Sequence, residues 1–330
     1  MSTIDPMLNV RIIKDWNWPD LRRQTPGQTG IWGDICFTLD PVPECDVLVV
    51  LNNRMRTPTR VRCPAENVWA LMQEPYLKGF TDWMVEKHQP FARFFTHYPA
   101  SDHPRYAVSQ PALPWHVNRS FDELLDAPVP EKRHQISWVV GNARDLPGHR
   151  LRYGLFDVLQ AGGHGMDIDL FGRAVQPIED KWDGLAPYRY SLAVENTSGP
   201  DYWTEKLSDC FLSWTVPIYF GCTNLEDYFP SEAFIRLDIR DPAGALERLR
   251  RILDEDRWQN RLEALAEARR RVLLRYQLFP WLTDLIRRHV SGQERRRSAV
   301  VVPAYRRSLR ATFYHWGYKV RKERGMRIKP

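Results

Sequence analysis

The alternation of apolar runs and amphipathic stretches is most regular between Tyr188 and Gly221. Two short apolar runs, Ser191–Val194 and Val216–Phe220, have the length of buried strands. Between them, four apolar residues recur at the spacing of one helix face: Leu207, Cys210, Phe211 and Trp214. Residues 195–203 contain Gly, Pro, Asn and Asp and are predicted to turn. The pattern therefore predicts a strand, a loop, a helix and a second strand.

The preceding stretch shows the same order of elements. Ile136–Val140 is predicted to be a strand, Arg150–Leu159 a helix, and Met166–Phe171 the next strand. A strand–helix–strand unit of this length is expected to be parallel and right-handed. The second half of the chain is therefore predicted to contain a parallel α/β sheet.

Helices are predicted to follow this sheet. Asp241 and Pro242 have the residue types of a helix start, and apolar residues recur at helical spacing after them. A further helical region covers residues 257–288 and is predicted to bend or break near Pro280.

The first half of the chain is less regular, but it also contains buried strands. These are predicted at Val10–Ile13, Asp46–Leu51 and Val68–Met72. The aromatic stretch Phe80–Phe95 is predicted to be helical in part, and the charged, Pro-containing residues 120–135 are the best candidate linker. We therefore expect an N-terminal domain over residues 1–130, a C-terminal domain over 131–288 and a tail over 289–330.

Composition limits the compartment and the class of protein. The 330 residues are 43% hydrophobic, which is enough for two real cores. No apolar run approaches the ~20 residues that span a membrane, and the first residues lack the pattern of a signal peptide. The five cysteines show no metal-ligand spacing. We expect a cytoplasmic protein with reduced thiols.

The positive net charge is confined to the tail. Residues 291–330 contain nine Arg and three Lys against two Glu, whereas the rest of the chain has 35 basic and 39 acidic residues. Aromatic residues are interleaved with these cations, a composition that suits an anionic membrane surface. A solvated tail is an equal alternative. A nucleic-acid partner is disfavoured because no RNA-binding motif accompanies the charge.

Polar side chains cluster where the predicted loop meets the predicted helix. Glu195 and Asn196 end a strand, and Thr204, Glu205 and Lys206 begin the helix. Ligands of open α/β sheets bind beyond the carboxyl ends of strands, and helix N-termini attract phosphate. Simple capping of the helix by this Thr and Glu is compatible with the same residues. The chemistry predicts a nucleotide or nucleotide-sugar site.

The sequence ENTSGPDYWTEKL followed by VPIYFG resembles the donor-binding motif of the family 10 glycosyltransferases, the α-1,3-fucosyltransferases. The resemblance extends over residues 136–238. It implies a GT-B fold, in which two Rossmann-like domains face a cleft and helices follow at the C-terminus. It also implies inverting transfer of L-fucose from GDP-β-L-fucose to a glycan hydroxyl, giving an α-1,3-type fucoside.

The same resemblance assigns the catalytic residues. Glu74, just after a strand of the first half, matches the general base, since a glutamate carboxylate is ionised at neutral pH and can accept a proton. Arg152 matches an arginine that contacts the diphosphate, with Arg150 as its rival. Lys206 is expected to stabilise the leaving diphosphate as a point charge.

The remaining donor-binding residues are also implied by the resemblance. Glu205 is expected to bind the ribose hydroxyls, Tyr202 the phosphate or the fucose, and Asn196 a position near the phosphates. Glu195 is expected to orient the loop or touch the sugar, and Asn142 matches an asparagine near the donor. We expect no cofactor and no metal, because folds of this type use basic residues at the diphosphate.

Three alternatives stay open at the level of sequence. The donor could be another GDP-sugar, since the diphosphate residues do not read the sugar. The protein could be an inactive relative that binds a membrane surface, although four compatible charged residues argue against it. The tail could drive nucleic-acid binding. The acceptor is expected to bind the N-terminal domain and residues 97–119, and a lipopolysaccharide or capsule glycan is the expectation from bacterial relatives.

Overall fold

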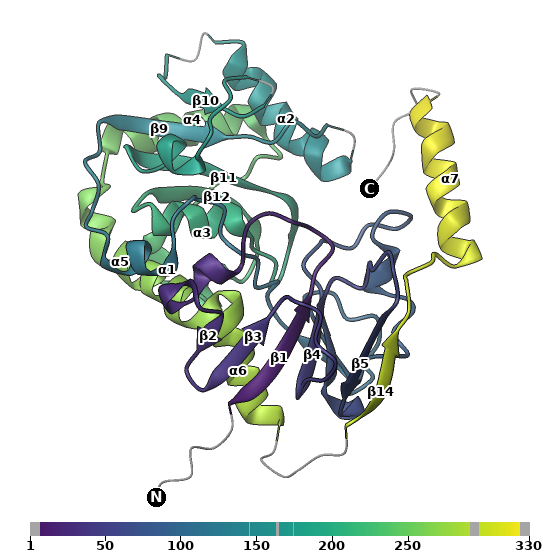
Figure 1. Ribbon diagram of the computed structural model, residues 1–330. Helices are drawn as coiled ribbons and strands as arrows, with labels where there is room; N and C mark the ends of the chain where they lie inside the picture. The colour runs from purple at the N-terminus through teal and green to yellow at the C-terminus, as the bar shows by residue number, and fades with distance from the viewer. Residues whose placement is uncertain (1–6, 145, 163–164, 174, 291–296, 324–330) are drawn as a thin grey trace, which may run out of the picture. The chain divides into compact units, whose positions relative to one another are not determined.

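The chain forms two compact units in the computed structural model, which describes residues 7–144, 146–162, 165–173, 175–290 and 297–323 (Figure 1). Unit 1 contains residues 7–113, the short segment Ser120–Asp122, and the described residues of 278–323. Unit 2 contains Pro114–Arg119 and Glu123–Gln277. The candidate linker at residues 120–135 includes a short helix, α1 (Phe121–Asp126).

Unit 2 is built on a parallel sheet of five strands. In order across the sheet these are β10 (Asp169–Phe171), β9 (His134–Val139), β11 (Tyr188–Gly199), β12 (Val216–Cys222) and β13 (Ile235–Arg236). Neighbouring strands are parallel throughout. The strand order is that of a flavodoxin-like sheet, in which the order of strand addition reverses between the parallel neighbours β9 and β11.

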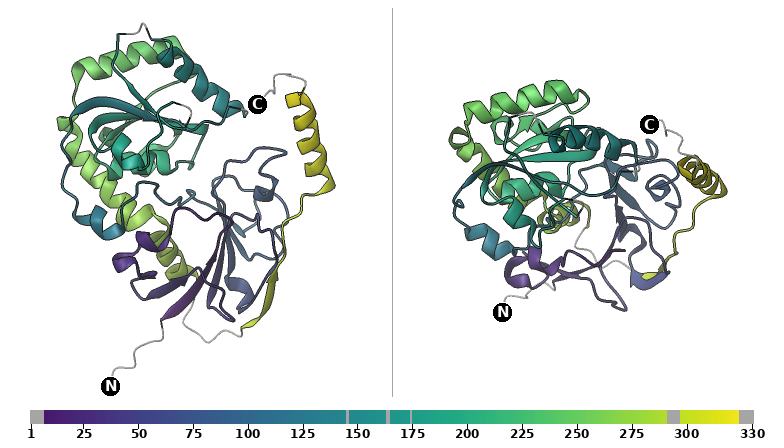
Figure 2. Two further views of the ribbon diagram at one scale, coloured as in Figure 1. Left: turned by 45° about the horizontal axis from the view of Figure 1, so that its top comes forward. Right: turned by 90° about the horizontal axis from the view of Figure 1, so that it is seen from above.

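Helices cover both faces of this sheet (Figures 1 and 2). Two of them pack together on one face, α2 (Pro147–Gln160) and α4 (Pro242–Glu255). On the other face, α3 (Glu205–Leu212) packs on α5 (Leu262–Arg271). The predicted strands and helices of this half are confirmed. However, β11 continues to Gly199 through residues predicted to turn, because a bulge after Val194 lets Gly199 pair with Cys222.

Unit 1 contains a seven-stranded sheet. Its strands, in order, are β2 (Ile31–Trp32), β3 (Ile35–Thr38), β1 (Leu8–Ile13), β4 (Val47–Leu51), β6 (Val68–Leu71), β7 (Arg93–Thr96) and β8 (Tyr106–Val108). All neighbours are parallel except β2 and β3. The three strands predicted in this half are confirmed.

The helical prediction for Phe80–Phe95 is mostly wrong. Within this stretch the helical conformation is limited to a 3-10 turn, Asp82–Met84, and the stretch ends in β7. Its aromatic residues Trp83, Phe91 and Phe94 are buried in a cluster on one face of the sheet. Their burial is therefore explained by sheet packing and not by helical periodicity.

The opposite face of the unit 1 sheet is covered by a helix from the far end of the chain. Alternate residues of β4 point to opposite faces, and Val47, Val49 and Leu51 pack with α6 (Leu278–His289). In α6, Leu278, Leu282 and Ile286 are fully buried in that cluster. The structure thus ends unit 2 at Gln277, whereas the sequence placed the boundary at residue 288.

The break in the C-terminal helical region lies before Pro280. Gln277 is extended, with φ −65° and ψ 163°, after a π-helical turn at Val272–Tyr276. Pro280 lies in the first turn of α6, where a missing N–H costs little because those groups have no intrahelical acceptor. The predicted break near Pro280 is therefore confirmed, and it lies at Gln277.

The tail is folded where the structure describes it. β14 (Ser298–Val302) pairs antiparallel with β5 (Thr59–Cys63) of unit 1. A long helix, α7 (Leu309–Glu323), follows. It contacts the segment after β6 of the same unit through His315 Nδ1, which lies 2.7 Å from Gly79 O. Across the described part of the chain, no helix combines the length and the apolar character needed to cross a bilayer.

Candidate functional site

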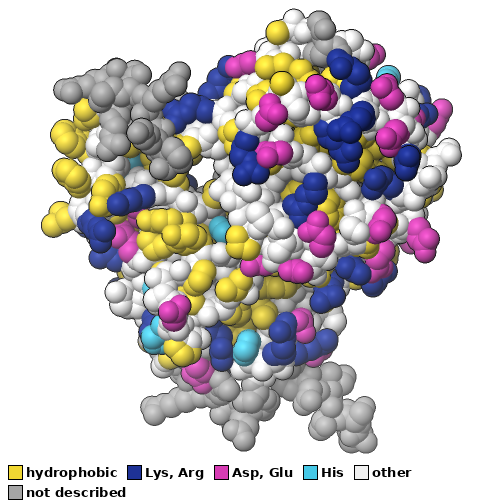
Figure 3. All heavy atoms as spheres, turned by 180° about the vertical axis from the view of Figure 1, so that it is seen from behind, with side chains coloured by type: hydrophobic (Ala, Val, Ile, Leu, Met, Phe, Trp, Pro, Cys, Tyr) yellow, Lys and Arg dark blue, Asp and Glu magenta, His cyan; other side chains and the backbone are white. Residues whose placement is uncertain are grey.

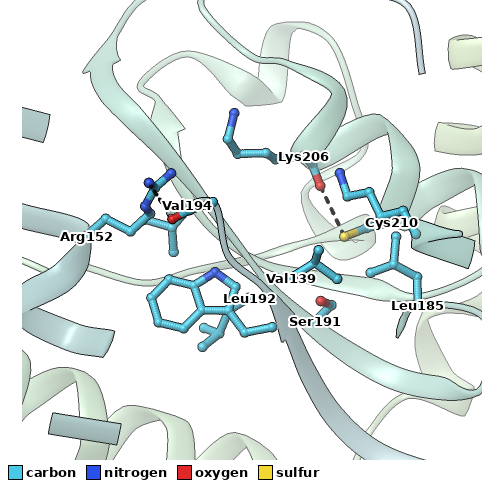
Figure 4. A pocket seen from close by; sticks show the side chains of 11 residues that line it. Val139, Arg152, Leu185, Ser191, Leu192, Val194, Lys206 and Cys210 are labelled. Atoms are coloured by element: carbon cyan, nitrogen blue, oxygen red, sulfur yellow. Dashed lines mark hydrogen bonds between the residues drawn. The ribbon is translucent and has the colours of Figure 1, made fainter. Parts of the chain in front are cut away.

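A pocket of unit 2 lies at the point where the strand order reverses. From β9 the chain continues to β10 on one side of this point, and from β11 it continues to β12 on the other side. Ligands of such sheets bind beyond the carboxyl ends of the two central strands. Gly141 and Asn142 follow β9, and Glu195 follows the regular part of β11. The pocket beside them is lined by Arg152 from α2 and Lys206 from α3 (Figure 4).

Two glycines permit the close approach of backbone segments at this point. A Cβ on Gly148, in the first turn of α2, would lie 1.6 Å from the carbonyl oxygen of Asn196. A Cβ on Gly221 would lie 2.4 Å from Cγ of Glu195. Because no other residue fits either position, the start of α2 is held against the end of β11, and Glu195 has room beside β12.

Glu195 is the buried centre of the site. Its side chain is fully excluded from solvent. It accepts hydrogen bonds from the backbone N–H and the hydroxyl of Thr204, both at 2.8 Å, and from Lys206 Nζ at 3.1 Å. Burial raises the pKa of Glu195, although Lys206 opposes that shift. Glu195 therefore orders the loop before α3, which is one of the two roles expected for it.

Lys206 has no spare hydrogen-bond donor in this arrangement. Its three N–H groups are matched by Glu195 Oε2 and Thr204 Oγ1, both at 3.1 Å, and by Glu205 Oε1 at 3.3 Å. Burial alone would lower the pKa of Lys206, but the two carboxylates raise it above its ordinary value. The residue stays charged, and it can donate to a ligand only if Glu205 moves.

The pKa of Glu205 is shifted in the opposite direction. Burial would raise this pKa, but Lys206, His116 and Lys181 together lower it below its ordinary value. Glu205 is thus an ionised, partly exposed acceptor beside the pocket, with 15% of its side chain accessible. An acceptor of this kind suits a ligand that brings hydroxyl donors.

Arg152 is the cation with unused capacity. It is buried, and its Nη2 donates to the carbonyl oxygens of Gly141 and Ala143, each at 3.2 Å. Its Nε is also buried and has no hydrogen-bond partner within the described ranges. Burial lowers the pKa of Arg152. In Figure 4 its guanidinium and the Lys206 ammonium extend to the same side of the pocket.

The structure separates Arg152 from its rival. Arg150 lies in the same helix, but its side chain is exposed and it is not among the pocket residues. Burying an arginine that forms no ion pair with any described residue is unfavourable unless a ligand compensates for it. The geometry therefore favours Arg152 as the residue that faces an anion.

The other predicted site residues occupy three different settings. Asn142 is exposed just past β9, and Asn196 is half-buried at the end of β11. Tyr202 is buried, with its hydroxyl 3.5 Å from Asn196 Oδ1. Glu74 belongs to unit 1, where it is exposed three residues after β6. The structure brings the unit 2 residues together and places Glu74 at the carboxyl edge of the other sheet.

The sequence analysis missed a second ion pair under α3. Lys181 Nζ lies 2.6 Å from Asp209 Oδ2, and the Asp209 side chain is fully buried. Asp209 also accepts from the backbone N–H of His116 at 2.8 Å. Burial opposes the charged form of Lys181, yet Asp209 and Glu205 raise its pKa overall. No local pattern links these residues, which are 28 positions apart in the chain.

This ion pair predicts a large stability effect. We expect Lys181→Met to reduce the free energy of unfolding by about 3–5 kcal/mol, because the Asp209 carboxylate would remain buried without its cation. Chemical denaturation followed by circular dichroism measures it. The control is Arg240→Met, which removes an exposed ion pair with Asp238 and should leave the free energy of unfolding close to that of the wild type. Equal effects of the two variants would contradict a supporting role for the buried pair.

The site as a whole can hold an anion with hydroxyl groups. The start of α2 and Arg152 supply positive potential, and Glu205 supplies an acceptor. Nowhere in the described ranges do three His, Cys, Asp or Glu side chains form a group able to bind a metal ion. Two aspartates of this half of the chain have protein partners: Asp157 pairs with Arg144 at 3.5 Å, and Asp169 accepts from Tyr188 at 2.7 Å.

Comparison with known proteins shows which family this chain resembles. Residues 129–261 match the family model described as glycosyltransferase family 10 (fucosyltransferase) C-term. The 3-galactosyl-N-acetylglucosaminide 4-alpha-L-fucosyltransferase of Pan troglodytes is 33% identical over 158 residues, which cover 46% of this chain and 40% of that protein. The 4-galactosyl-N-acetylglucosaminide 3-alpha-L-fucosyltransferase of Homo sapiens is 26% identical over 302 residues, covering 85% of this chain and 78% of that protein.

A structural likeness extends over both units. A solved alpha1,3-fucosyltransferase superimposes with a TM-score of 0.50 at 16% identity, covering 80% of this chain and 82% of that one. The predicted GT-B class, with two Rossmann-like units and C-terminal helices, is confirmed, and so is the resemblance carried by the motif. The chain spans about 40% of the length of the first curated relatives that it matches.

Proposed function

We propose, from the match of residues 129–261 to the family model of the glycosyltransferase family 10 C-terminal region, that the protein is an inverting fucosyltransferase. It transfers L-fucose from GDP-β-L-fucose to a glycan hydroxyl and forms an α-1,3-type fucoside. The observation that carries the proposal is Arg152, a buried cation with an unused Nε that lines the pocket at the strand-order reversal. A diphosphate is the anion that suits such a position.

Stabilisation of the leaving group is assigned to Arg152 and Lys206. As the bond between fucose C1 and the diphosphate oxygen breaks, the electron pair stays on GDP, and its negative charge grows. A preorganised cation in a water-poor pocket stabilises that charge strongly. Arg152 acts by direct hydrogen bonds, whereas Lys206 acts through its charge as long as Glu195, Thr204 and Glu205 occupy its three donors.

Binding of the donor is expected to rearrange one contact. Glu205 is the most accessible of the three acceptors of Lys206. Its contact with Lys206 Nζ, at 3.3 Å, is also the longest of the three. When Glu205 accepts the two ribose hydroxyls, one N–H of Lys206 becomes available to the diphosphate. Asn142, Asn196 and Tyr202, around the ends of β9 and β11, are assigned to the phosphate and sugar positions.

Proton removal is assigned to Glu74. The acceptor hydroxyl attacks C1 from the face opposite the diphosphate, so the configuration inverts as the new C–O bond forms. The hydroxyl proton passes to the Glu74 carboxylate, which is exposed at the carboxyl edge of the unit 1 sheet. No step needs a metal or another cofactor, because cationic side chains balance the charge of the leaving GDP.

A donor panel tests this function. The purified protein is incubated with one of three donors, GDP-fucose, GDP-mannose or UDP-galactose. Each donor is tested with two acceptors, a methyl 4-galactosyl-N-acetylglucosaminide and a lipopolysaccharide oligosaccharide. We expect a product heavier by one deoxyhexose residue only with GDP-fucose, detected by mass spectrometry. Turnover only with another GDP-sugar would support the assignment of the GDP site and reject fucose as the transferred sugar. Absence of turnover, with no release of GDP from any donor, would contradict the enzyme assignment.

We also propose that α7 docks on an anionic membrane surface. Three large apolar side chains, Leu309, Phe313 and Trp316, recur at i, i+4 and i+7 and are 92%, 66% and 61% exposed. Hydrophobic side chains gather at the left edge of Figure 3, over this part of the chain. The exposed cations Arg306 and Lys319 flank that face and suit acidic headgroups.

Vesicle sedimentation tests this docking. We expect the protein to sediment with phosphatidylcholine vesicles containing phosphatidylglycerol, less so with phosphatidylcholine alone, and to lose most binding in Phe313→Ser/Trp316→Ser. The control is Val301→Ser, which removes an exposed apolar side chain from β14. Equal sedimentation of the α7 variant and wild type would exclude this face.

A further inference from the structure

A second pocket lies in unit 1, between α7 and the segment that follows Glu74. Its main polar and aromatic lining residues are Tyr76, Lys78, Asp82, Glu86, Arg310 and Tyr314. The first four come from the segment after β6, and the last two come from α7. We propose that this pocket is a subsite for a neutral, hydroxyl-rich oligosaccharide, the acceptor of the reaction. The inference rests on the proposed function, because it names the second substrate of the same enzyme.

The position of the pocket relates it to Glu74 within one unit. Tyr76 is two residues beyond Glu74 and five beyond the end of β6. Its ring stacks on Tyr98, which follows β7 by two residues, with ring centroids 4.8 Å apart and planes at 24°. Adjacent parallel strands end at the same edge of a sheet. The stacked tyrosines and Glu74 therefore share the carboxyl edge of the unit 1 sheet.

The aromatic pair provides a platform for a sugar ring. Tyr98 is 46% exposed, so one side of the pair is accessible to solvent. The face of an aromatic ring carries partial negative charge and attracts the positively polarised C–H groups of a pyranose. Stacking against Tyr98 fixes the orientation of Tyr76 before any ligand binds. A preordered platform lowers the entropic cost of binding.

One carboxylate of the pocket has unused acceptor capacity. Asp82 is 4% exposed, and its Oδ1 accepts from the backbone N–H of Gly79 at 2.9 Å. Its buried Oδ2 forms an ion pair with Arg307 Nε at 3.6 Å but has no hydrogen-bond partner in the described part of the chain. A buried carboxylate oxygen needs a donor, and sugar hydroxyls are donors.

The charges of the pocket balance, which suits a neutral ligand. The carboxylates Asp82 and Glu86 are matched by the cations Lys78 and Arg310, so the lining carries no net charge that would attract an anion. The cations Lys78 and Arg310 are already close to the Tyr314 ring, with Lys78 Nζ 3.6 Å from its centroid. They hold α7 against the segment after β6, and their remaining N–H groups can bind sugar oxygens. α7 thus forms a wall of the subsite with one face and exposes its apolar residues on another.

Kinetics of three variants test the subsite, with a methyl 4-galactosyl-N-acetylglucosaminide as acceptor. We expect Tyr76→Leu, Asp82→Asn and Arg310→Ala to raise KM for this acceptor by about tenfold each. The KM for GDP-fucose and the affinity for GDP should stay unchanged. Thr312→Ala, an exposed position of α7 outside the lining, is the matched control. Because Arg310 is exposed, we expect Arg310→Ala to fold, so this variant tests the subsite even if Asp82→Asn fails to fold.

A binding measurement separates this inference from the proposed function. Saturation-transfer NMR with the same oligosaccharide needs no turnover. We expect transfer to the sugar protons in wild type and its loss in Tyr76→Leu and Arg310→Ala. An inactive protein that still binds the oligosaccharide through these residues would reject the fucosyltransferase assignment and retain the subsite. An unchanged NMR signal and an unchanged acceptor KM in these variants would overturn the subsite.

Discussion

Glu74→Gln is expected to lower kcat for fucosyl transfer by about 10²–10⁴-fold, the usual contribution of a positioned general base. The amide keeps the size of the side chain and cannot accept the proton of the acceptor hydroxyl. The affinity for GDP should stay at the wild-type value, because Glu74 belongs to unit 1 and the donor pocket is lined by unit 2 residues. Initial rates and a GDP titration measure the two effects.

A matched control distinguishes base catalysis from loss of surface charge. Glu66 precedes the same strand, β6, and is also exposed, but it lies at the amino end. Glu66→Gln should therefore keep wild-type rates. If Glu74→Gln retained more than about a tenth of the wild-type kcat, the base would have to be another residue.

Arg152→Ala is expected to reduce kcat/KM for GDP-fucose by about 10²–10³-fold, the usual effect of removing one preorganised electrostatic contact. Arg152→Lys should recover little of that loss. The ammonium of lysine lacks the planar fork that contacts Gly141, Ala143 and a ligand at the same time. Initial rates at varied GDP-fucose concentration give this ratio for each variant.

Arg150 provides the control within the same helix. Its side chain is exposed, so Arg150→Ala should change kcat/KM by less than about threefold. Thermal unfolding of both variants checks that α2 remains folded. A larger loss in Arg150→Ala than in Arg152→Ala would reverse the assignment of the diphosphate ligand.

The sequence predicted the elements of unit 2 because their signals are local. Leu207, Cys210 and Phe211 mark the buried face of α3, and the apolar run at Val216–Phe220 marks β12. The motif also indicated polar residues that the structure brings together around Glu195. What the pattern could not show is that Glu195 itself caps the start of α3, where it accepts the N–H of Thr204. The phosphate that the sequence predicted at the start of this helix is therefore assigned to the side of the pocket where Arg152 lies.

The misplaced domain boundary has a different cause. Leu278, Leu282 and Ile286 show that a helix face is buried, but periodicity does not show which sheet buries it. The same limit applies to β14, whose antiparallel partner β5 lies more than 200 positions earlier. Contacts between distant segments, such as Lys181 with Asp209, depend on the completed fold and leave no local pattern.

A calorimetric titration of the purified protein with GDP, with UDP as the comparison, tests the central claim most directly. The account predicts saturable GDP binding, with UDP bound at least about tenfold more weakly, and loss of GDP binding in Arg152→Ala. It predicts that Tyr76→Leu binds GDP as wild type does. Absence of GDP binding in wild type, or equal binding by wild type and Arg152→Ala, would contradict a donor site at the junction of β9 and β11.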